Sequence, residues 1–371
     1  ENMFDPVKFV ERSIVELRRT YGSAKKILAA VSGGVDSVTS AVLVRKALGS
    51  VVKAVYIDTG FMRLNEGHFV RDTLKELIDV EVIDRSSRFY DNLLGLEDAE
   101  HKRVVFRDTF YAVLSELVSE YGCDHLVQGT IKADIVETVG GVKTQHNVLS
   151  EELQVKYGVK VIEPLKDLYK HEVREVARYL GIPETIVNRQ PFPGPGLLVR
   201  TVGRFTLEKL DVVRRATDKV EKFLRDAGAS QYFAAAWDFD LGPLERLCLS
   251  SGKCVEFSKF KTLATGVKEG KRVYAAIGLL SEDLELRENE LLELVDKAGV
   301  SRFVLLLNES SSGRYFVSIR AVSTLDYMTA SVVKPPEKTL RELASTILEI
   351  EGVKAVGFDI TPKPPATIEY E

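Results

Sequence analysis

Residues 27–42 read Ile-Leu-Ala-Ala-Val-Ser-Gly-Gly-Val-Asp-Ser-Val-Thr-Ser-Ala-Val, and this stretch decides the fold of the first half of the chain. The apolar run at 27–31 predicts a buried strand. A Ser-Gly-Gly turn then leads into a helix that carries Val38, Ala41 and Val42 on its apolar side. A strand followed at once by a helix is the repeating unit of a parallel sheet.

The same alternation continues along the chain. Strands are predicted at 51–57, 80–84 and 124–128, with helices near 66–78 and 102–121 between them. The pattern predicts an α/β fold, a doubly wound parallel sheet, in which ligands bind beyond the carboxyl ends of the strands. The segments at those ends are Ser32-Gly33-Gly34, Asp58-Thr59-Gly60, Asp84-Arg85 and Gly129-Thr130.

Composition excludes several classes of protein. A chain of 371 residues with 45% hydrophobic and 29% charged residues has room for two or three folded domains. A net charge of −4 argues against a general nucleic-acid binder, although it leaves room for a local anion site. Apolar runs are too short to cross a membrane, so we expect a cytoplasmic protein with no membrane or nucleic-acid partner. The three cysteines show no CxxC spacing and are expected to be reduced, mostly buried thiols.

The second half of the chain follows a different pattern. A polar stretch at 140–161 predicts a mobile loop or lid, and a helix is expected at 170–180. Residues 189–196, Arg-Gln-Pro-Phe-Pro-Gly-Pro-Gly, cannot be a helix or a central strand, which predicts domains at 1–190 and 191–371. Strand–helix–strand patterns at 270–310 and 313–363 indicate a smaller α+β domain. They are either an internal repeat or two unrelated units of a common motif.

The strongest chemical signal is the turn Ser32-Gly-Gly-Val-Asp-Ser37. Two glycines let the backbone approach an anion closely, two hydroxyls add donors, and the following helix directs its positive end at the site. Asp36 would repel a phosphate by itself, but it fits as a ligand of Mg²⁺ that bridges phosphates. The sequence contains no GxxxxGK[ST] motif, so this is not a Walker loop.

This turn resembles the pyrophosphate loop of the N-type ATP pyrophosphatases, and later segments are similar to the GMP synthetase family in particular. Those segments occur in the family's order over most of the chain. They are 128–131 with Asp134 and Glu137, the lid motif 143–147, the lid helix 169–174, the proline–glycine segment 189–200, and the carboxyl-terminal 363–371.

The resemblance implies an ATP-pyrophosphatase domain followed by a dimerisation domain that binds xanthosine monophosphate (XMP). ATP would adenylate XMP and release pyrophosphate, and ammonia would then displace AMP to give GMP. By resemblance, Asp36 and Lys170 act in catalysis, and Asp36 also holds the metal. ATP and pyrophosphate would be bound by Ser32, Gly33, Gly34, Val35, Asp36, Ser37, Asp58 and Gly129, and XMP by Arg103, Gln231, Lys363, Ile368 and Glu369.

The sequence also departs from the family pattern. Gln145 follows Thr144 in the lid motif, where the family has histidine, and His171 replaces an aspartate of the lid helix. Extra residues at about 234–312 resemble a doubled dimerisation module, which implies either a homodimer or a monomer with an internal pseudo-dimer. No cysteine lies in a glutaminase-type Gly-Cys-Gly turn, so the resemblance implies a separate glutamine amidotransferase subunit as the ammonia source.

Two alternatives remain open on the residues. One is another ligase with a pyrophosphate loop, such as an NAD synthetase or a tRNA-modifying thiolase, although the paired cysteines of the thiolase are missing. The other is a catalytically silent interaction protein that keeps the same fold.

Overall fold

The computed structural model describes all residues except 1–2, 135–150, 152–153 and 155–157. The chain divides into two compact units. Unit 1 comprises Glu1–Gly60, Asn65–Phe89 and Phe106–Phe192, and unit 2 comprises Phe61–Leu64, Tyr90–Val105 and Pro193–Glu371. The sequence did not predict that residues 61–64 and 90–105, from the first half of the chain, belong to unit 2. Most of the predicted lid at 140–161 lies outside the described residues.

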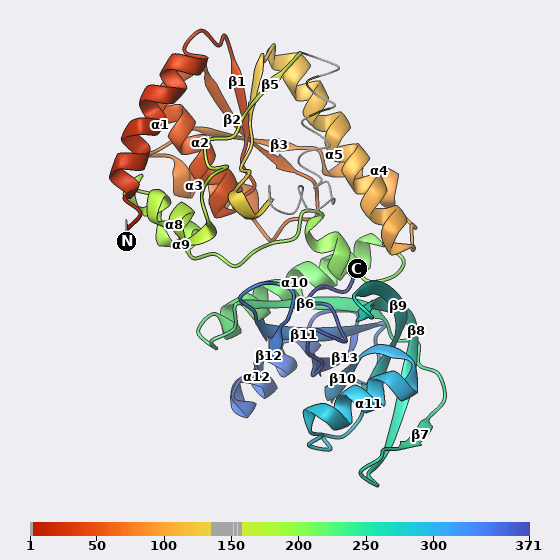
Figure 1. The fold of residues 1–371 in the computed structure, drawn as a ribbon. Coiled ribbons are helices and arrows are strands. Elements are labelled where there is room, and N and C mark those ends of the chain that lie inside the picture. The colour runs from red at the N-terminus through yellow and green to blue at the C-terminus, as the bar shows by residue number, and fades with distance from the viewer. Residues whose placement is uncertain (1–2, 135–150, 152–153, 155–157) are drawn as a thin grey trace. The chain divides into compact units, whose positions relative to one another are not determined.

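Unit 1 is built on a five-stranded sheet in which every neighbouring pair is parallel (Figure 1). The strand order is β3-β2-β1-β4-β5, which confirms the predicted doubly wound sheet. The order reverses between β1 and β4, and ligands bind at such a switch point in open α/β sheets. The strands are β1 (Ile27–Ala30), β2 (Val52–Asp58), β3 (Val80–Asp84), β4 (His125–Val127) and β5 (Lys160–Ile162).

The helices of unit 1 begin where the sequence offers caps and apolar faces. Asp5 caps α1 by accepting hydrogen bonds from the backbone N–H groups of Val7 and Lys8. Helix α2 is buried along most of its length and packs against α1 and α8. The helices are α1 (Pro6–Tyr21), α2 (Val35–Leu48), α3 (Glu66–Leu74), α4 (Ser86–Leu93), α5 (Ala99–Tyr121), α8 (Lys170–Tyr179) and α9 (Glu184–Val187), with a 3-10 turn η1 (Gly49–Val51). Helices α4 and α5 also contribute residues to unit 2.

Unit 2 contains a mixed eight-stranded sheet with the path β12-β11-β13-β10-β9-β8-β7, and β6 pairs with β11. Both predicted strand–helix–strand units are present as parallel pairs, β9 with β10 and β11 with β13. Whether they are copies of one unit stays a prediction. The strands are β6 (Gln231–Asp238), β7 (Glu245–Cys248), β8 (Cys254–Lys268), β9 (Lys271–Leu280), β10 (Val300–Glu309), β11 (Tyr315–Ser323), β12 (Ser331–Val332) and β13 (Val353–Asp359).

The core of unit 2 surrounds Trp237, which is fully buried. Its ring stacks on Phe316 at a centroid distance of 5.2 Å and meets Phe260 edge-on at 5.5 Å. A second apolar cluster lies under α11. The helices are the 3-10 helix η2 (Gly196–Arg200), α10 (Leu207–Leu224), α11 (Glu288–Ala298) and α12 (Glu337–Leu348).

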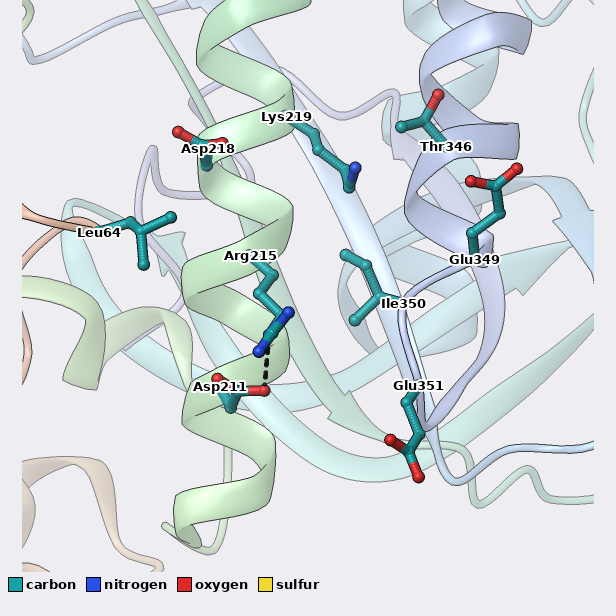
Figure 2. Close-up of a pocket in the computed structure, with 9 residues that line it drawn as sticks. All are labelled: Leu64, Asp211, Arg215, Asp218, Lys219, Thr346, Glu349, Ile350 and Glu351. Atoms are coloured by element: carbon teal, nitrogen blue, oxygen red, sulfur yellow. Dashed lines mark hydrogen bonds and ion pairs between the residues drawn. The ribbon is translucent and has the colours of Figure 1, made fainter.

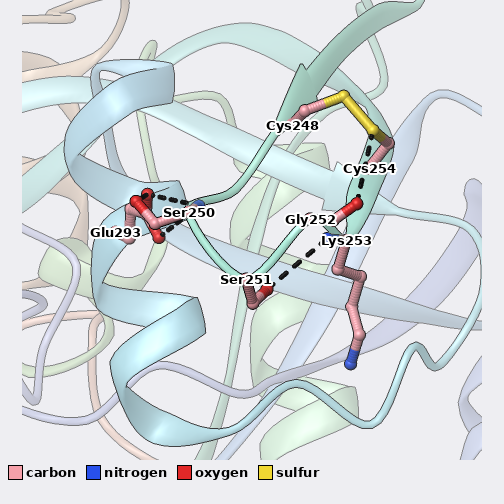
Figure 3. Close-up of a disulfide and its surroundings, with 7 residues drawn as sticks. All are labelled: Cys248, Ser250, Ser251, Gly252, Lys253, Cys254 and Glu293. Atoms are coloured by element: carbon pink, nitrogen blue, oxygen red, sulfur yellow. Dashed lines mark hydrogen bonds between the residues drawn. A yellow bond between two sulfur atoms is a disulfide. The ribbon is translucent and has the colours of Figure 1, made fainter.

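The expectation of three reduced thiols was wrong. Cys248 and Cys254 form a disulfide at the loop end of the β7–β8 hairpin, and both residues are exposed (Figure 3). The hairpin register places the two residues directly opposite each other, which their spacing in the sequence did not reveal. The enclosed loop is fastened to α11, because Ser250 donates from both its N–H and its hydroxyl to Glu293. Cys123 is a free, buried thiol, as expected.

Candidate functional site

The predicted anion loop connects β1 to α2 at the switch point of the sheet in unit 1. Gly34 is the N-cap residue of α2, so the first N–H groups of the helix face the loop without partners from the preceding turn. Ser37 braces the loop from within: its hydroxyl accepts from the N–H of Ser32 at 3.0 Å and lies 3.0 Å from the Ser32 hydroxyl. The loop therefore combines backbone donors, two hydroxyls and the positive end of a helix.

Two glycines allow this backbone geometry. Gly33 has φ +84°, in the left-handed region that favours glycine. Gly129, which follows β4, lies against the first turn of α2, and a Cβ atom there would be only 2.9 Å from the backbone nitrogen of Ser37. Gly129 therefore allows the end of β4 to approach the anion loop closely.

Asp36 and Lys170, which the resemblance assigned to catalysis, meet in unit 1. The Lys170 ammonium donates to Asp36 Oδ2 at 2.9 Å from the first position of α8. Burial raises the pKa of Asp36, and the charge of Lys170 opposes that shift. Asp36 Oδ1 is buried and has no hydrogen-bond partner among the described residues.

Other predicted residues of unit 1 lie at the ends of strands. Asp58 ends β2 and accepts from the N–H of Gly60 at 2.8 Å, so its carboxylate fixes the turn that follows. Asp134 accepts from the N–H of Ile131 at 2.9 Å and holds the segment after β4. Glu137, the lid motif at 143–147 and its altered residues Thr144 and Gln145 lie outside the described residues. His171 is described, and its ring stacks on that of Tyr169.

Unit 2 brings two of the predicted XMP residues to one cluster of positive charge. Arg103 on α5 and Lys363 both lie close enough to Arg272 to feel its charge. Burial, and then repulsion from Arg272, lowers the pKa of Arg103 and of Lys363 alike. The cluster is partly balanced by Glu100, which lies 3.7 Å from Arg272.

Sequence reasoning missed Arg272. The signal was available, because Arg272 stands second in a strand that follows the turn at Glu269 and Gly270, both of which have positive φ. In a strand, Arg272 shares its face with Tyr274. The sequence alone does not show that the fold brings Arg272 near Arg103.

The remaining predicted XMP residues are more deeply placed. Gln231 is buried at the start of β6, opposite Val322 of β11. Ile368 is 7% exposed and belongs to the core cluster around Trp237. Glu369 receives two hydrogen bonds from the buried Arg200 guanidinium, at 2.8 and 3.0 Å. The structure thus places Glu369 in a fixed, paired position.

A groove of about 440 Å³ lies elsewhere in unit 2, between α10 and α12 (Figure 2). It contains none of the predicted site residues. Four acidic side chains outnumber two basic ones in its lining, and Asp211 and Arg215 are paired with each other at 2.9 Å. An acidic groove disfavours phosphate compounds, so we do not assign it to nucleotide binding. Its lining residues are Leu64, Asp211, Arg215, Asp218, Lys219, Thr346, Glu349, Ile350 and Glu351.

Across the described residues, no helix is both long and apolar enough to cross a membrane. The same part of the chain holds no group of three or more His, Cys, Asp or Glu side chains arranged to bind a metal ion.

Comparisons with known proteins agree with this arrangement. The profile of the family described as NAD synthase matches residues 153–200, and that of the GMP synthase C terminal domain matches residues 301–370. Curated relatives match over the whole chain. The protein is 46% identical to one subunit of glutamine-hydrolyzing GMP synthase from Saccharolobus solfataricus, over 100% of both chains. It is 39% identical to the subunit of the same name from Methanopyrus kandleri, again over 100% of both chains. The chain therefore belongs to the family of this GMP synthase subunit.

Proposed function

We propose that this protein converts XMP to GMP in an ATP-dependent amination, with ammonia supplied by a separate glutaminase subunit. The observation that carries the proposal is the end-to-end match to GMP synthase subunits, and the glycine-rich loop of unit 1 and the cations around Arg272 in unit 2 support it. The XMP C2 oxygen attacks the α-phosphorus of ATP, and the bond to pyrophosphate breaks. Ammonia then attacks C2, and AMP leaves with its oxygen.

The anion loop is suited to the first step. Pyrophosphate gains charge as it leaves, and the preorganised N–H groups and hydroxyls at Ser32–Ser37 stabilise that charge without reorganising. We assign Asp58 and Gly129 to the adenosine side of ATP, because Asp58 ends β2 and Gly129 lies just past β4, the two strands next to β1, at the carboxyl edge of the sheet. Lys170 donates to phosphate oxygens once it leaves Asp36.

The donor set at the loop fits Mg²⁺. Mg²⁺ is commonly held by one or two carboxylates together with substrate phosphates. Asp36 offers a buried carboxylate oxygen that has no partner among the described residues. Asp36 would hold the ion, and the bound ion would offset the negative charge of the phosphates.

The cation cluster is suited to the phosphate of XMP. Burial, and then the charge of Arg272, lowers the pKa of Arg103 and of Lys363, and a dianionic phosphate near Arg272 would relieve the repulsion that Arg272 exerts on each. Gln231, Ile368 and Glu369 remain our assignments for the rest of the nucleotide. Arg200 offsets the charge of Glu369.

The state of the cysteines supports a separate ammonia source. A glutaminase nucleophile needs an accessible thiolate. Cys248 and Cys254 are joined in a disulfide, and burial raises the pKa of Cys123 to about 11. None of the three cysteines in the chain therefore offers a reactive thiolate in this structure. The cytoplasmic location, and the choice between a homodimer and a monomer with an internal pseudo-dimer, stay predictions.

The test is a product assay on the purified chain. With ATP, Mg²⁺, ammonium and XMP, we expect GMP, AMP and pyrophosphate in equal amounts. With glutamine in place of ammonium, we expect no GMP. The proposal fails if no GMP forms with ammonium, or if nicotinic acid adenine dinucleotide is aminated instead of XMP. A chain that turns over neither compound would support the silent interaction protein.

A further inference from the structure

A buried ion pair in unit 1 lies beside the anion loop and has no role in the function proposed above. Arg189 binds Glu66 with both ends of its guanidinium, at 2.5 and 2.7 Å. The side chains are 15% and 3% exposed, and the guanidinium also lies 4.9 Å from the centre of the Phe69 ring. Glu66 opens α3 and Arg189 follows α9, so the pair joins two distant segments at one point.

The pair lies against Gly33 of the anion loop. The Arg189 guanidinium donates to the Gly33 carbonyl oxygen at 3.4 Å. A Cβ atom on Gly33 would lie 2.7 Å from Glu66 Oε1 and 2.9 Å from Arg189 Nη1. The ion pair therefore occupies the space that any larger side chain at this position would need.

The hydrogen bond from Arg189 to the Gly33 carbonyl also orients the N–H group of Gly34. In a trans peptide the C=O of one residue and the N–H of the next point in opposite directions within one plane. Holding the Gly33 oxygen toward Arg189 therefore directs the N–H of Gly34 away from it. The peptide joins two glycines, so no side chain on either residue restricts its rotation.

From this geometry we propose that Arg189, held in place by Glu66, is a positioning residue that orients the Gly33–Gly34 peptide so that the Gly34 N–H donates to pyrophosphate. The inference rests on the proposed function, because it assumes an anion at this loop. The expected loss without Arg189 is that of one hydrogen bond to a charged group, about tenfold to hundredfold in affinity.

The experiment measures binding of pyrophosphate and of XMP to the full chain by calorimetry in the presence of Mg²⁺. The variants are Arg189→Met, Arg189→Lys and Glu66→Gln. Arg189→Lys keeps the charge but not the two-point contact with Glu66. We expect both Arg189 variants to weaken pyrophosphate binding about tenfold or more and to leave XMP binding unchanged. Glu66→Gln should weaken pyrophosphate binding less, and it remains informative if an Arg189 variant does not fold.

The control is Arg19→Met, which removes an exposed ion pair with Glu16 on α1 in the same unit, at the helix end that precedes the start of β1 rather than the loop after it. It should bind pyrophosphate like the unaltered chain. Full pyrophosphate affinity in Arg189→Lys alone would mean that charge rather than peptide orientation matters, and this would overturn the inference. Full affinity in all three variants, or an equal loss of XMP binding, would overturn it as well. In each case the proposed function stands if the unaltered chain binds pyrophosphate and forms GMP, and it fails separately if the unaltered chain does neither.

Discussion

Gly129 gives the most direct test of how the anion loop is supported. Its backbone has no positive φ, so a change to alanine introduces a methyl group without backbone strain. That methyl would lie 2.9 Å from the nitrogen of Ser37, 3.0 Å from the carbonyl carbon of Asp36 and 3.1 Å from the Cα of Ser37. All three atoms are backbone at the start of α2, and no flexible side chain can move aside instead.

The size of the effect follows from these contacts. Ordinary contact requires the loop to move by roughly half an ångström, and overpacking of this kind costs about 1–3 kcal/mol. If the strain falls on the loop, pyrophosphate affinity drops by about fivefold to hundredfold. Misplacement of the α-phosphorus would lower kcat as well. We therefore expect Gly129→Ala to raise the KM for ATP and lower kcat, while the KM for XMP changes little.

The assay is steady-state release of pyrophosphate with ATP and XMP varied in turn, together with thermal unfolding. Gly242→Ala is the control, because Gly242 also lacks a positive φ and the nearest atom to its added methyl group, the carbonyl oxygen of Lys259, is 3.4 Å away. It should retain both KM values. A Gly129→Ala variant with unchanged kinetics for ATP would show that the approach of β4 to α2 does not shape the site.

Three further outcomes follow from unit 2. Arg272→Met should raise the KM for XMP about tenfold to hundredfold with the KM for ATP unchanged, and an equal rise in both would count against a phosphate site. Burial and Arg272 lower the pKa of Lys363, so XMP binding should weaken on the alkaline side at a lower pH than for an ordinary lysine. Because Arg272→Met removes a like charge, it should raise the pH at which XMP binding weakens, and a shift of that pH downward would contradict the argument. Lys102→Met leaves the buried carboxylate of Glu371 without its cation and should destabilise the fold by about 3–5 kcal/mol in chemical unfolding; a loss below about 1 kcal/mol would mean that water reaches the pair.

The fold of unit 1 could be predicted because its signals are local. Each buried strand is a short apolar run followed by a turn, and the Ser-Gly-Gly turn at 32–34 identifies the first crossover. Right-handed connections then leave few possible strand orders. The assignment of residues 61–64 and 90–105 to unit 2 had no such signal, because it depends on long-range packing such as that of Phe61 and Tyr90 against Phe205.

The parts of the candidate site that depend on local sequence could be predicted, and those that depend on long-range packing could not. The chemistry of the anion loop can be read from six consecutive residues. Arg272, in contrast, is brought within reach of the charges of Arg103 and Lys363 only by the fold. The disulfide shows the same limit. Cys248 and Cys254 become partners only because the β7–β8 register places them opposite each other. Likewise, nothing in the sequence indicates that Glu66 and Arg189 form an ion pair.

The segment from Thr361 to Glu371 raises a physical question, because three of the proposed XMP residues lie in a stretch without helix and with only isolated bridge pairing. Such a stretch is usually too mobile to position a ligand. Here two guanidinium groups from β10 and β11, both fully buried, hold its backbone. Arg302 donates to the carbonyl of Glu369 at 3.0 Å, and Arg320 donates to the carbonyl of Thr367 at 2.9 Å.

Both arginines also bind one buried carboxylate, Asp359 on β13, at 3.0 and 3.1 Å. Two buried cations against one anion would be unfavourable without further partners. The carbonyl oxygens of the segment supply those partners. The arginines are therefore stabilised by the segment, and the segment is held in place by the arginines. These hydrogen bonds between buried groups therefore give an irregular stretch the rigidity that a strand would have through its ladder. This explains how Ile368 and Glu369, two of the residues that we propose for XMP, can hold fixed positions.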